Sequence, residues 1–158
     1  MSLNPYSPPG AIIDDVMNAP PLWNPNAAAN WSLLFSPAFG AFVHMKNWQA
    51  LGEPEKAANA KTWAIASLVS IVLSSGFALM SSSSTDQGMT RMIGFILLLS
   101  WYFSSGRAQA KYVETQFGKT YPRRGWLQPL LFAVLVFVAY LVVLAIFGFA
   151  SGGFAGKD

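Results

Sequence analysis

The sequence predicts an all-α fold, a polytopic transmembrane helical bundle with four spans at about 27–46, 56–81, 89–117 and 127–150. Three observations predict it. Of the 158 residues, 53% are hydrophobic and 11% are charged, whereas soluble domains average about 25% charged. Residues 62–80 and 127–150 contain no charge, and about 20 apolar residues suffice to cross a bilayer. The basic residues gather in alternate loops, which is typical of multi-pass membrane proteins.

Residues 1–26 are predicted to form a proline-rich, irregular arm. They contain six of the ten prolines and no Lys or Arg. Proline lacks a backbone N–H and disfavours helix in the residue before it. The arm either hangs free or packs on the membrane surface or a partner. We expect residues 27–153 to form one transmembrane helical domain, followed by a short tail at 154–158.

The first span, 27–46, differs from a plain membrane anchor because it contains Pro37, Gly40 and His44. Pro37 predicts a kink, which membrane helices tolerate when neighbouring groups bond the freed carbonyl. We expect this segment to cross the bilayer, and a re-entrant or interfacial helix is the alternative. A turn at Gly52 then precedes Pro54, a residue that suits the first position of a helix. Spans one and two should therefore form a helical hairpin.

The third span is the least regular of the four. Its uncharged core, 92–106, has only 15 residues, but Arg91 and Arg107 can extend their long side chains to the interface at either end. The pattern predicts that this helix continues out of the membrane to about residue 117. The fourth span, 127–150, has Pro129 near its start, where a missing N–H is tolerated.

Charge placement predicts the topology. Eight of the ten basic residues lie in two alternate loops, three within 46–61 and five within 107–124. The positive-inside rule places both loops in the cytoplasm. With four crossings of a bacterial inner membrane, both termini are then periplasmic. The absence of Lys and Arg before position 46 favours crossing by the first segment.

Two sets of residues are candidates for contacts. Small residues at a spacing of four allow close approach of membrane helices, either within the bundle, in a homo-oligomer or with a partner; these are Ala66, Ser70, Ser74 and Ala78, with Gly148 and Gly152 in a short G-x-x-x-G. Basic residues of the last loop either anchor the topology or contact lipid headgroups or a cytosolic partner; these are Arg107, Lys111, Lys119, Arg123 and Arg124.

Residues that could support catalysis are few. The chain has one histidine, His44, no cysteine, and seven carboxylates, none of which lies in a predicted membrane-crossing stretch; Glu114 falls in the cytoplasmic extension of the third helix. A metal site needs several such ligands, and we expect no metal, cofactor or enzyme activity. The formal net charge of +3 is explained by membrane topology, so we expect no nucleic-acid partner.

The segment NPNAAANWSLLFSPAFGAFVHMKNWQALGEPEKA, residues 24–57, resembles the leading hairpin of small uncharacterised bacterial multi-pass inner-membrane proteins. The residues that match this pattern are Pro37, Gly40, Asn47, Trp48, Leu51 and Gly52. The later segment KYVETQFGKTYPRRGWLQPLL is similar to the last basic loop of the same proteins. The resemblance implies the multi-pass fold, and it implies no activity or functional residue.

These features predict a non-enzymatic integral membrane protein that acts by binding another protein. A concrete form is an immunity protein against a membrane-acting bacterial toxin. One alternative is an accessory subunit of a larger membrane complex. Another is a small channel or transporter with a polar path of serines, namely Ser67, Ser70, Ser74, Ser75, Ser100 and Ser104.

Overall fold

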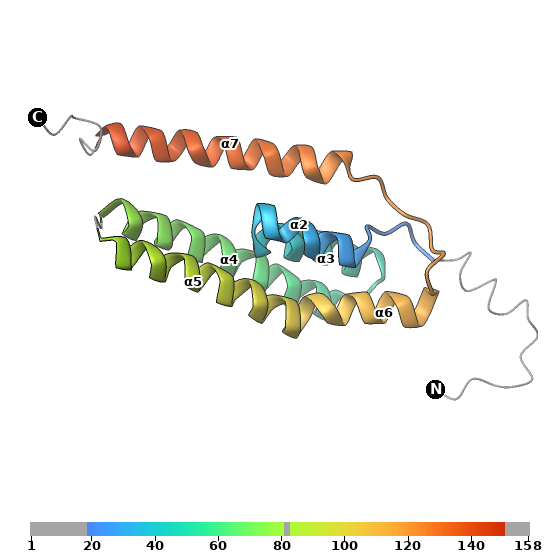
Figure 1. Cartoon of the computed structure of the whole chain (residues 1–158). Coiled ribbons are helices and arrows are strands. Elements are labelled where there is room, and N and C mark those ends of the chain that lie inside the picture. The colour runs from blue at the N-terminus through green and yellow to red at the C-terminus, as the bar shows by residue number, and fades with distance from the viewer. Residues whose placement is uncertain (1–18, 81–82, 151–158) are drawn as a thin grey trace, which may run out of the picture.

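A computed structural model describes residues 19–80 and 83–150, and these residues form long helices joined by short segments (Figure 1). The all-helical architecture that the sequence predicts is confirmed for this part of the chain. The expected arm up to position 18 and the tail at 154–158 lie outside the described residues. In chain order the helices are α2 (Pro25–Phe35), α3 (Pro37–Ala50), α4 (Pro54–Met80), α5 (Ser84–Trp101), a π-helical turn (Tyr102–Gly106), α6 (Arg107–Phe117) and α7 (Leu127–Ala150).

The expected first span is not one helix, because the chain reverses direction at Ser36. The φ of Ser36 is +88°, and a residue before proline is disfavoured in helical conformation, so α2 ends at Phe35. Helices α2 and α3 then run antiparallel. The His44 ring near the end of α3 lies 3.2 Å from the carbonyl oxygen of Pro25 at the start of α2. The prediction of one continuous helix over 27–46 is therefore wrong, because two antiparallel helices occupy this segment.

Gly40 explains why the chain folds back tightly instead of only kinking at Pro37. A Cβ atom on Gly40 would collide with the hydroxyl of Ser32 on α2 and with the indole of Trp101 at the end of α5. Without that atom α2 lies directly against α3, and both helices contact α5 near its end. We refer to α2 and α3 together as the hairpin.

Two helices are long and apolar enough to cross a membrane, α4 over Pro54–Ala78 and α7 over Leu127–Phe149. At 1.5 Å per residue, the 27 residues of α4 span about 40 Å and the 24 residues of α7 about 36 Å. Helix α5 continues through the π-helical turn into α6. The third predicted helix is thus present with its extension to residue 117, although α5 alone does not pass the same test.

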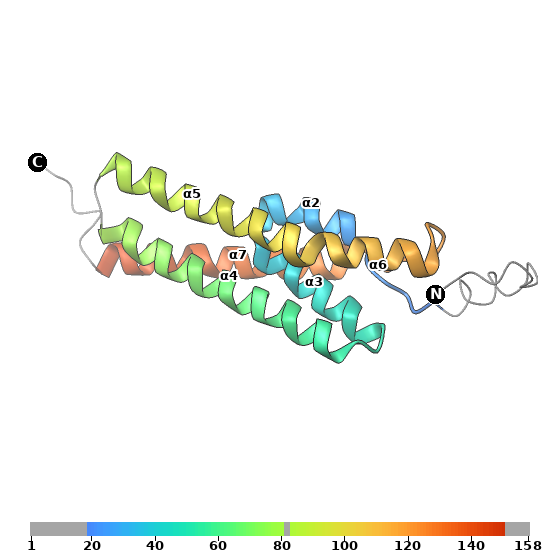
Figure 2. The same ribbon diagram turned by 90° about the horizontal axis from the view of Figure 1, so that it is seen from below.

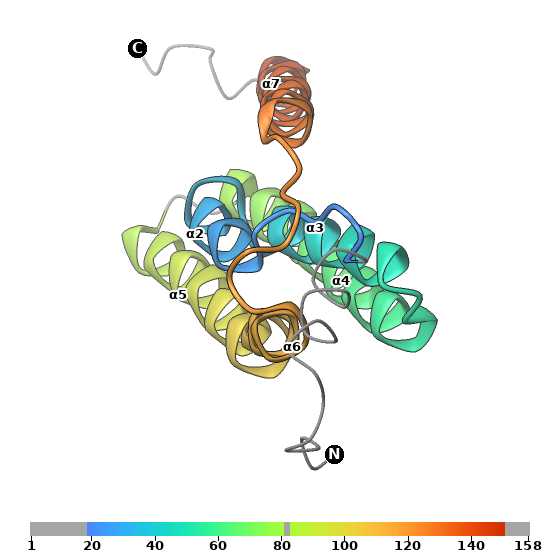
Figure 3. The same ribbon diagram turned by 90° about the vertical axis from the view of Figure 1, so that its right-hand side faces the viewer.

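The hairpin occupies only one half of the length of the bundle. Figures 1 and 2 show it beside the first half of α4 and the end of α5, whereas α4, α5 and α7 continue beyond its tip. In the end-on view of Figure 3, α7 lies apart from the other helices. It contacts them through Ala133, which packs on the hairpin, and through a hydrogen bond between Tyr140 and Ser75 of α4. Most of the large apolar side chains of α7 are exposed.

The two ends of the described chain lie at opposite ends of the bundle. The backbone of Leu22 forms a parallel bridge with Arg123, four residues before α7 starts. Position 150 is at the far end of α7, about 36 Å away along that helix. The expectation that both termini lie on one side followed from a full first span, and the reversal at Ser36 removes its basis.

Candidate functional site

A polar cluster joins the open end of the hairpin to α6. The side chain of Asn47 accepts a hydrogen bond from the backbone N–H of Trp23 at 3.0 Å and donates to the Trp23 carbonyl oxygen at 2.8 Å. It also donates to Oε1 of Gln109 at 3.1 Å. Nε2 of Gln109 donates to the backbone oxygen of His44 at 2.8 Å. We call Trp23, His44, Asn47 and Gln109 the polar lock.

The polar lock provides hydrogen-bond partners for backbone groups that lie outside the helices. Trp23 lies in the extended segment before α2, and Asn47 bonds both of its backbone groups. Asn47 and Gln109 are 1% and 0% exposed, and an unpaired buried polar group costs about 1–3 kcal/mol. The His44 ring, also fully buried, stacks at a tilt on Trp101 with 5.4 Å between ring centroids. These contacts fix where the hairpin sits along the α5–α6 helix.

The remaining residues of the hairpin motif build a second cluster at the α3–α4 turn. Gly52 has a φ of +71°, a conformation that other residues rarely adopt. Trp48 is buried and meets the ring of Tyr112 edge-on at 5.0 Å. The ammonium of Lys56 lies 4.9 Å from the Trp48 ring centre and 4.3 Å from that of Tyr112. Leu51 packs against the same cluster.

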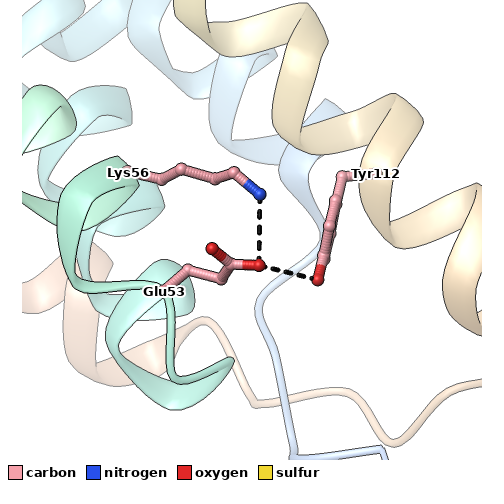
Figure 4. Close-up of polar contacts among 3 residues, drawn as sticks. All are labelled: Glu53, Lys56 and Tyr112. Carbon is pink, nitrogen blue, oxygen red and sulfur yellow. Dashed lines mark hydrogen bonds and ion pairs between the residues drawn. The ribbon is translucent and has the colours of Figure 1, made fainter.

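Glu53 completes this cluster, as Figure 4 shows. Its Oε1 lies 3.1 Å from the ammonium nitrogen of Lys56 and accepts a hydrogen bond of 3.0 Å from the hydroxyl of Tyr112. The hydrogen bond from Lys56, and then that from Tyr112, lowers the pKa of Glu53 below its ordinary value. Partial burial and the contact with Glu53 raise the pKa of Tyr112. The cluster ties the start of α4 to α6.

A seam of small residues on α4 is where the hairpin packs. Ala57, Ala60, Ala64 and Ser67 are all buried, whereas Ala66, the first residue of the expected face, is exposed. A spacing of four rotates 40° per step around a helix of 3.6 residues per turn, so 66, 70, 74 and 78 do not follow one line. Spacings that alternate between three and four residues, as in 57, 60, 64 and 67, stay on one face of the helix. The same spacings continue the seam to Ile71, Ser74 and Ala78.

The far half of this seam is not covered by the hairpin. There it lines a pocket of about 490 Å³ between the hairpin tip, α4 and α5, which we call the hairpin-tip pocket. Ser70, Ser74 and Ala78 of the expected face line it, with Ser36 at the tip and Gly94 on α5. No ionisable side chain lines this pocket.

Two serines of the pocket differ from the other helical hydroxyls that line it. Ser32, Ser75 and Thr90 donate to the carbonyl oxygen one turn earlier, which is the usual arrangement within helices. Ser70 and Ser74 make no hydrogen bond to any described residue, so their hydroxyls are free to bond an occupant of the pocket.

The remaining predicted contact residues lie in different places. Gly148 is buried on α7, and Gly152 lies outside the described residues. Arg107 and Lys111 are exposed on α6. Lys119 and Arg123 line a smaller pocket at the start of α2, and the guanidinium of Arg124 stacks 4.7 Å from the Trp23 ring. The basic loop is therefore not one continuous surface.

No protein-family model, curated protein or solved structure matches this chain. Within the described residues there is also no group of three or more His, Asp or Glu side chains that could hold a metal ion.

Proposed function

We propose that this protein is an integral membrane protein in which α4, α5 with α6, and α7 cross the bilayer, while the hairpin enters halfway and returns. The exposed apolar side chains of α4, α5 and α7 support this arrangement, because a soluble protein rarely exposes so large an apolar surface. Helix α2 has 11 residues and rises about 16 Å, roughly half of a 30 Å hydrocarbon core.

The basic residues orient this arrangement. Residues 46–61, from the end of α3 into the first turns of α4, and residues 107–124, from α6 to just before α7, carry eight of the ten Lys and Arg. Both groups lie at the end of the bundle where the hairpin opens. The positive-inside rule then places this end in the cytoplasm of a bacterial cell. The segment before α2 is on the cytoplasmic side in this topology, and the end of α7 is on the periplasmic side.

The function that the geometry supports best is the binding of another membrane protein in the hairpin-tip pocket. The observation that carries this proposal is the continuation of the α4 seam beyond the hairpin. One half of the seam receives α3 through Ala57, Ala60 and Ala64. The other half presents the same kind of surface through Ser74 and Ala78, beyond the tip of the hairpin, with α5 forming the opposite wall of the pocket.

The lining of the pocket suits an apolar helix of a partner protein. Membrane helices associate where small residues let their backbones approach and where hydroxyls bond across the interface. Ser70, Ser74 and Gly94 supply both features. A Cβ on Gly94 meets nothing within 4 Å, so the opposite wall leaves room for an incoming side chain. The partner chemistry is therefore an apolar helix with small or hydrogen-bonding residues facing the seam.

The serine path of a channel receives less support. Ser67 is buried within the seam, and Ser104 is exposed on the other helix, where it donates to the Ser100 carbonyl oxygen at 2.6 Å. A path of serines that crosses the membrane would have to continue through the half of the bundle that the hairpin fills. Toxin immunity and membership of a larger complex stay predictions, and both are forms of the contact proposed here.

Site-specific crosslinking tests the proposal, because the chain contains no cysteine. A benzophenone crosslinker attached to a cysteine at position 74 lies in the hairpin-tip pocket. The same crosslinker attached to a cysteine at position 66 lies on the exposed face of the same helix. In native membranes we expect the Ser74 probe alone to capture one protein of discrete mass. Gly94→Leu, which fills the pocket, should abolish that product.

Two outcomes would contradict the proposal. Equal products from the Ser74 and Ala66 probes would mean that the pocket is not selective. An adduct with lipid alone, or with a second copy of this chain, would mean that no partner helix occupies it. If a toxin is captured, a strain lacking this protein should become sensitive to that toxin.

A further inference from the structure

A second pocket, of about 180 Å³, lies where α2 begins and α6 ends. Asn24 and Asn26 line it at the start of α2, and Glu114 lines it from α6. Lys119 and Arg123 line it from the segment that leads to α7. We call it the interfacial pocket. It is formed by two parts of the chain that are far apart in the sequence, residues 24–26 and residues 110–123.

The backbone holds the basic side of this pocket in place. The N–H of Leu22 donates to the carbonyl oxygen of Pro122 at 3.0 Å, and the N–H of Arg124 donates to the carbonyl oxygen of Leu22 at 2.9 Å. The side chain of Arg123 donates from Nη2 to the carbonyl oxygen of Lys119 at 3.2 Å. The segment that bears the two cations is therefore fixed against the start of the hairpin.

The depth of the pocket is that of the lipid headgroups. Helix α7 starts at Leu127, four residues after Arg123, and its exposed apolar side chains begin there. Trp23 and Trp126 lie at the same level, and Nε1 of Trp23 donates to the carbonyl oxygen of Gly125 at 2.9 Å. Tryptophan is enriched at the interface between the hydrocarbon layer and water.

The pocket combines positive charge with neutral hydrogen-bonding groups. Lys119 and Arg123 are its two cations, and Glu114 is its one carboxylate, 3.9 Å from the Lys119 ammonium nitrogen. The side-chain oxygen of Asn24 caps α2 by accepting from the backbone N–H groups of Asn26 and Ala27, which leaves its amide nitrogen to donate, and the side chain of Asn26 can donate and accept. A guanidinium and an ammonium that line the same pocket can both bind a phosphate group, and a carboxylate and amides on its other wall suit the hydroxyls of a small polyol.

We infer that the interfacial pocket binds the headgroup of an anionic glycerophospholipid of the phosphatidylglycerol class. Arg123 and Lys119 hold the phosphodiester, and Glu114 with Asn26 holds the glycerol hydroxyls. The inference rests on the membrane placement proposed above, because only that placement brings the pocket to headgroup depth. A lipid headgroup and a cytosolic protein were both candidate partners for the basic residues of the last loop. For Lys119 and Arg123, we infer the lipid headgroup.

The test compares two pairs of substitutions with the same change in net charge. Lys119→Gln with Arg123→Gln removes the cations of the pocket, and Arg107→Gln with Lys111→Gln removes exposed cations of α6. Each protein is placed in phosphatidylcholine nanodiscs that contain a small fraction of phosphatidylglycerol, and retained lipid is counted by native mass spectrometry. We expect phosphatidylglycerol affinity to fall roughly 25-fold in the first pair, at about fivefold per basic residue, and little in the second.

An equal fall in both pairs would overturn the inference, because it would show diffuse attraction to basic residues instead of a site. Asn26→Leu obstructs the pocket without a change in charge and should also reduce phosphatidylglycerol retention; full retention would count against the pocket. Inorganic phosphate at millimolar concentration should not compete, and full competition would assign the site to free phosphate. A protein that fails to enter nanodiscs at all would refute the proposed membrane placement instead.

Discussion

Asn47→Leu is the substitution that tests the polar lock most directly. Leucine occupies a similar volume but can make none of the three hydrogen bonds of Asn47, two with the backbone of Trp23 and one with Gln109. At about 1 kcal/mol for each hydrogen bond, we expect the free energy of unfolding to fall by about 3 kcal/mol. The backbone groups of Trp23 and the side chain of Gln109 would then lack hydrogen-bond partners. The loss of unfolding free energy should therefore exceed that of an ordinary surface substitution.

The assay is reversible unfolding in mixed micelles of a mild detergent and dodecyl sulfate, followed by helix content. Gln49→Leu is the matched control, because the side chain of Gln49 is exposed on the same helix and makes no hydrogen bond to a described residue. Gln109→Leu alone should also destabilise the protein. Because residues of one network are not additive, the double variant with Asn47→Leu should lose less than the sum of the two. If Asn47→Leu lowers the free energy of unfolding no more than Gln49→Leu does, the stabilising role of the polar lock is refuted.

Three further predictions concern other parts of the chain. Gly40→Ala should lower the free energy of unfolding by about 1–3 kcal/mol through overpacking, whereas Gly94→Ala, with open space at its Cβ, should change it little; equal losses would contradict the close approach of α2. The pKa of Glu53 is lowered in the folded state, so its contribution is present above its ordinary value of 4.5 and is lost as pH falls through the folded pKa. The difference in thermal unfolding temperature between the protein and its Glu53→Gln variant should therefore be larger at pH 6 than at pH 3. A single cysteine at Pro21 should stay unlabelled in intact cells by an impermeant reagent that labels one at Gln87, and labelling of both would restore the full first span.

Much of the helical framework could be predicted because it depends on local sequence. The apolar stretches of α4 and α7 lack charges over a bilayer thickness, and no other element accommodates such a stretch. The α3–α4 turn was also predictable, since Gly52 supplies a positive φ and Pro54 suits the first helical position. In both cases the residues that specify the structure lie next to each other in the chain.

The reversal at Ser36 depends on contacts that are distant in the sequence. Pro37 is compatible with a kink as well as with a turn, and the choice is made by Gly40, which admits Ser32 and Trp101 at once. Gln109 was missed as a site residue for the same reason. It lies in a basic, amphipathic segment, and only the folded chain brings it to Asn47. Its position was a clue, because Gln109 lies on the same face of α6 as Val113, and both residues are buried.

The line of small residues that α3 covers on α4 differs from the predicted contact residues, for a geometric reason. Ala66 and Ser70 belong to a run of small residues spaced by four, and such a run drifts around the helix. Ala64 and Ser67 belong to the line that stays on one face, and it is this line that α3 covers. Both lines were present in the sequence, and only the partner helix selects between them.

The reversal at Ser36 also bears on how the protein is inserted into the membrane. In the proposed topology, the segment before Pro25, which carries five prolines and two aspartates, does not have to be translocated across the hydrocarbon layer. Between the described helices, the polar segment to be exported in this topology is the short connection between α4 and α5. Insertion should therefore proceed at its normal rate in cells depleted of the ATP-driven translocation motor, and a strict requirement for that motor would argue that the first segment is exported after all.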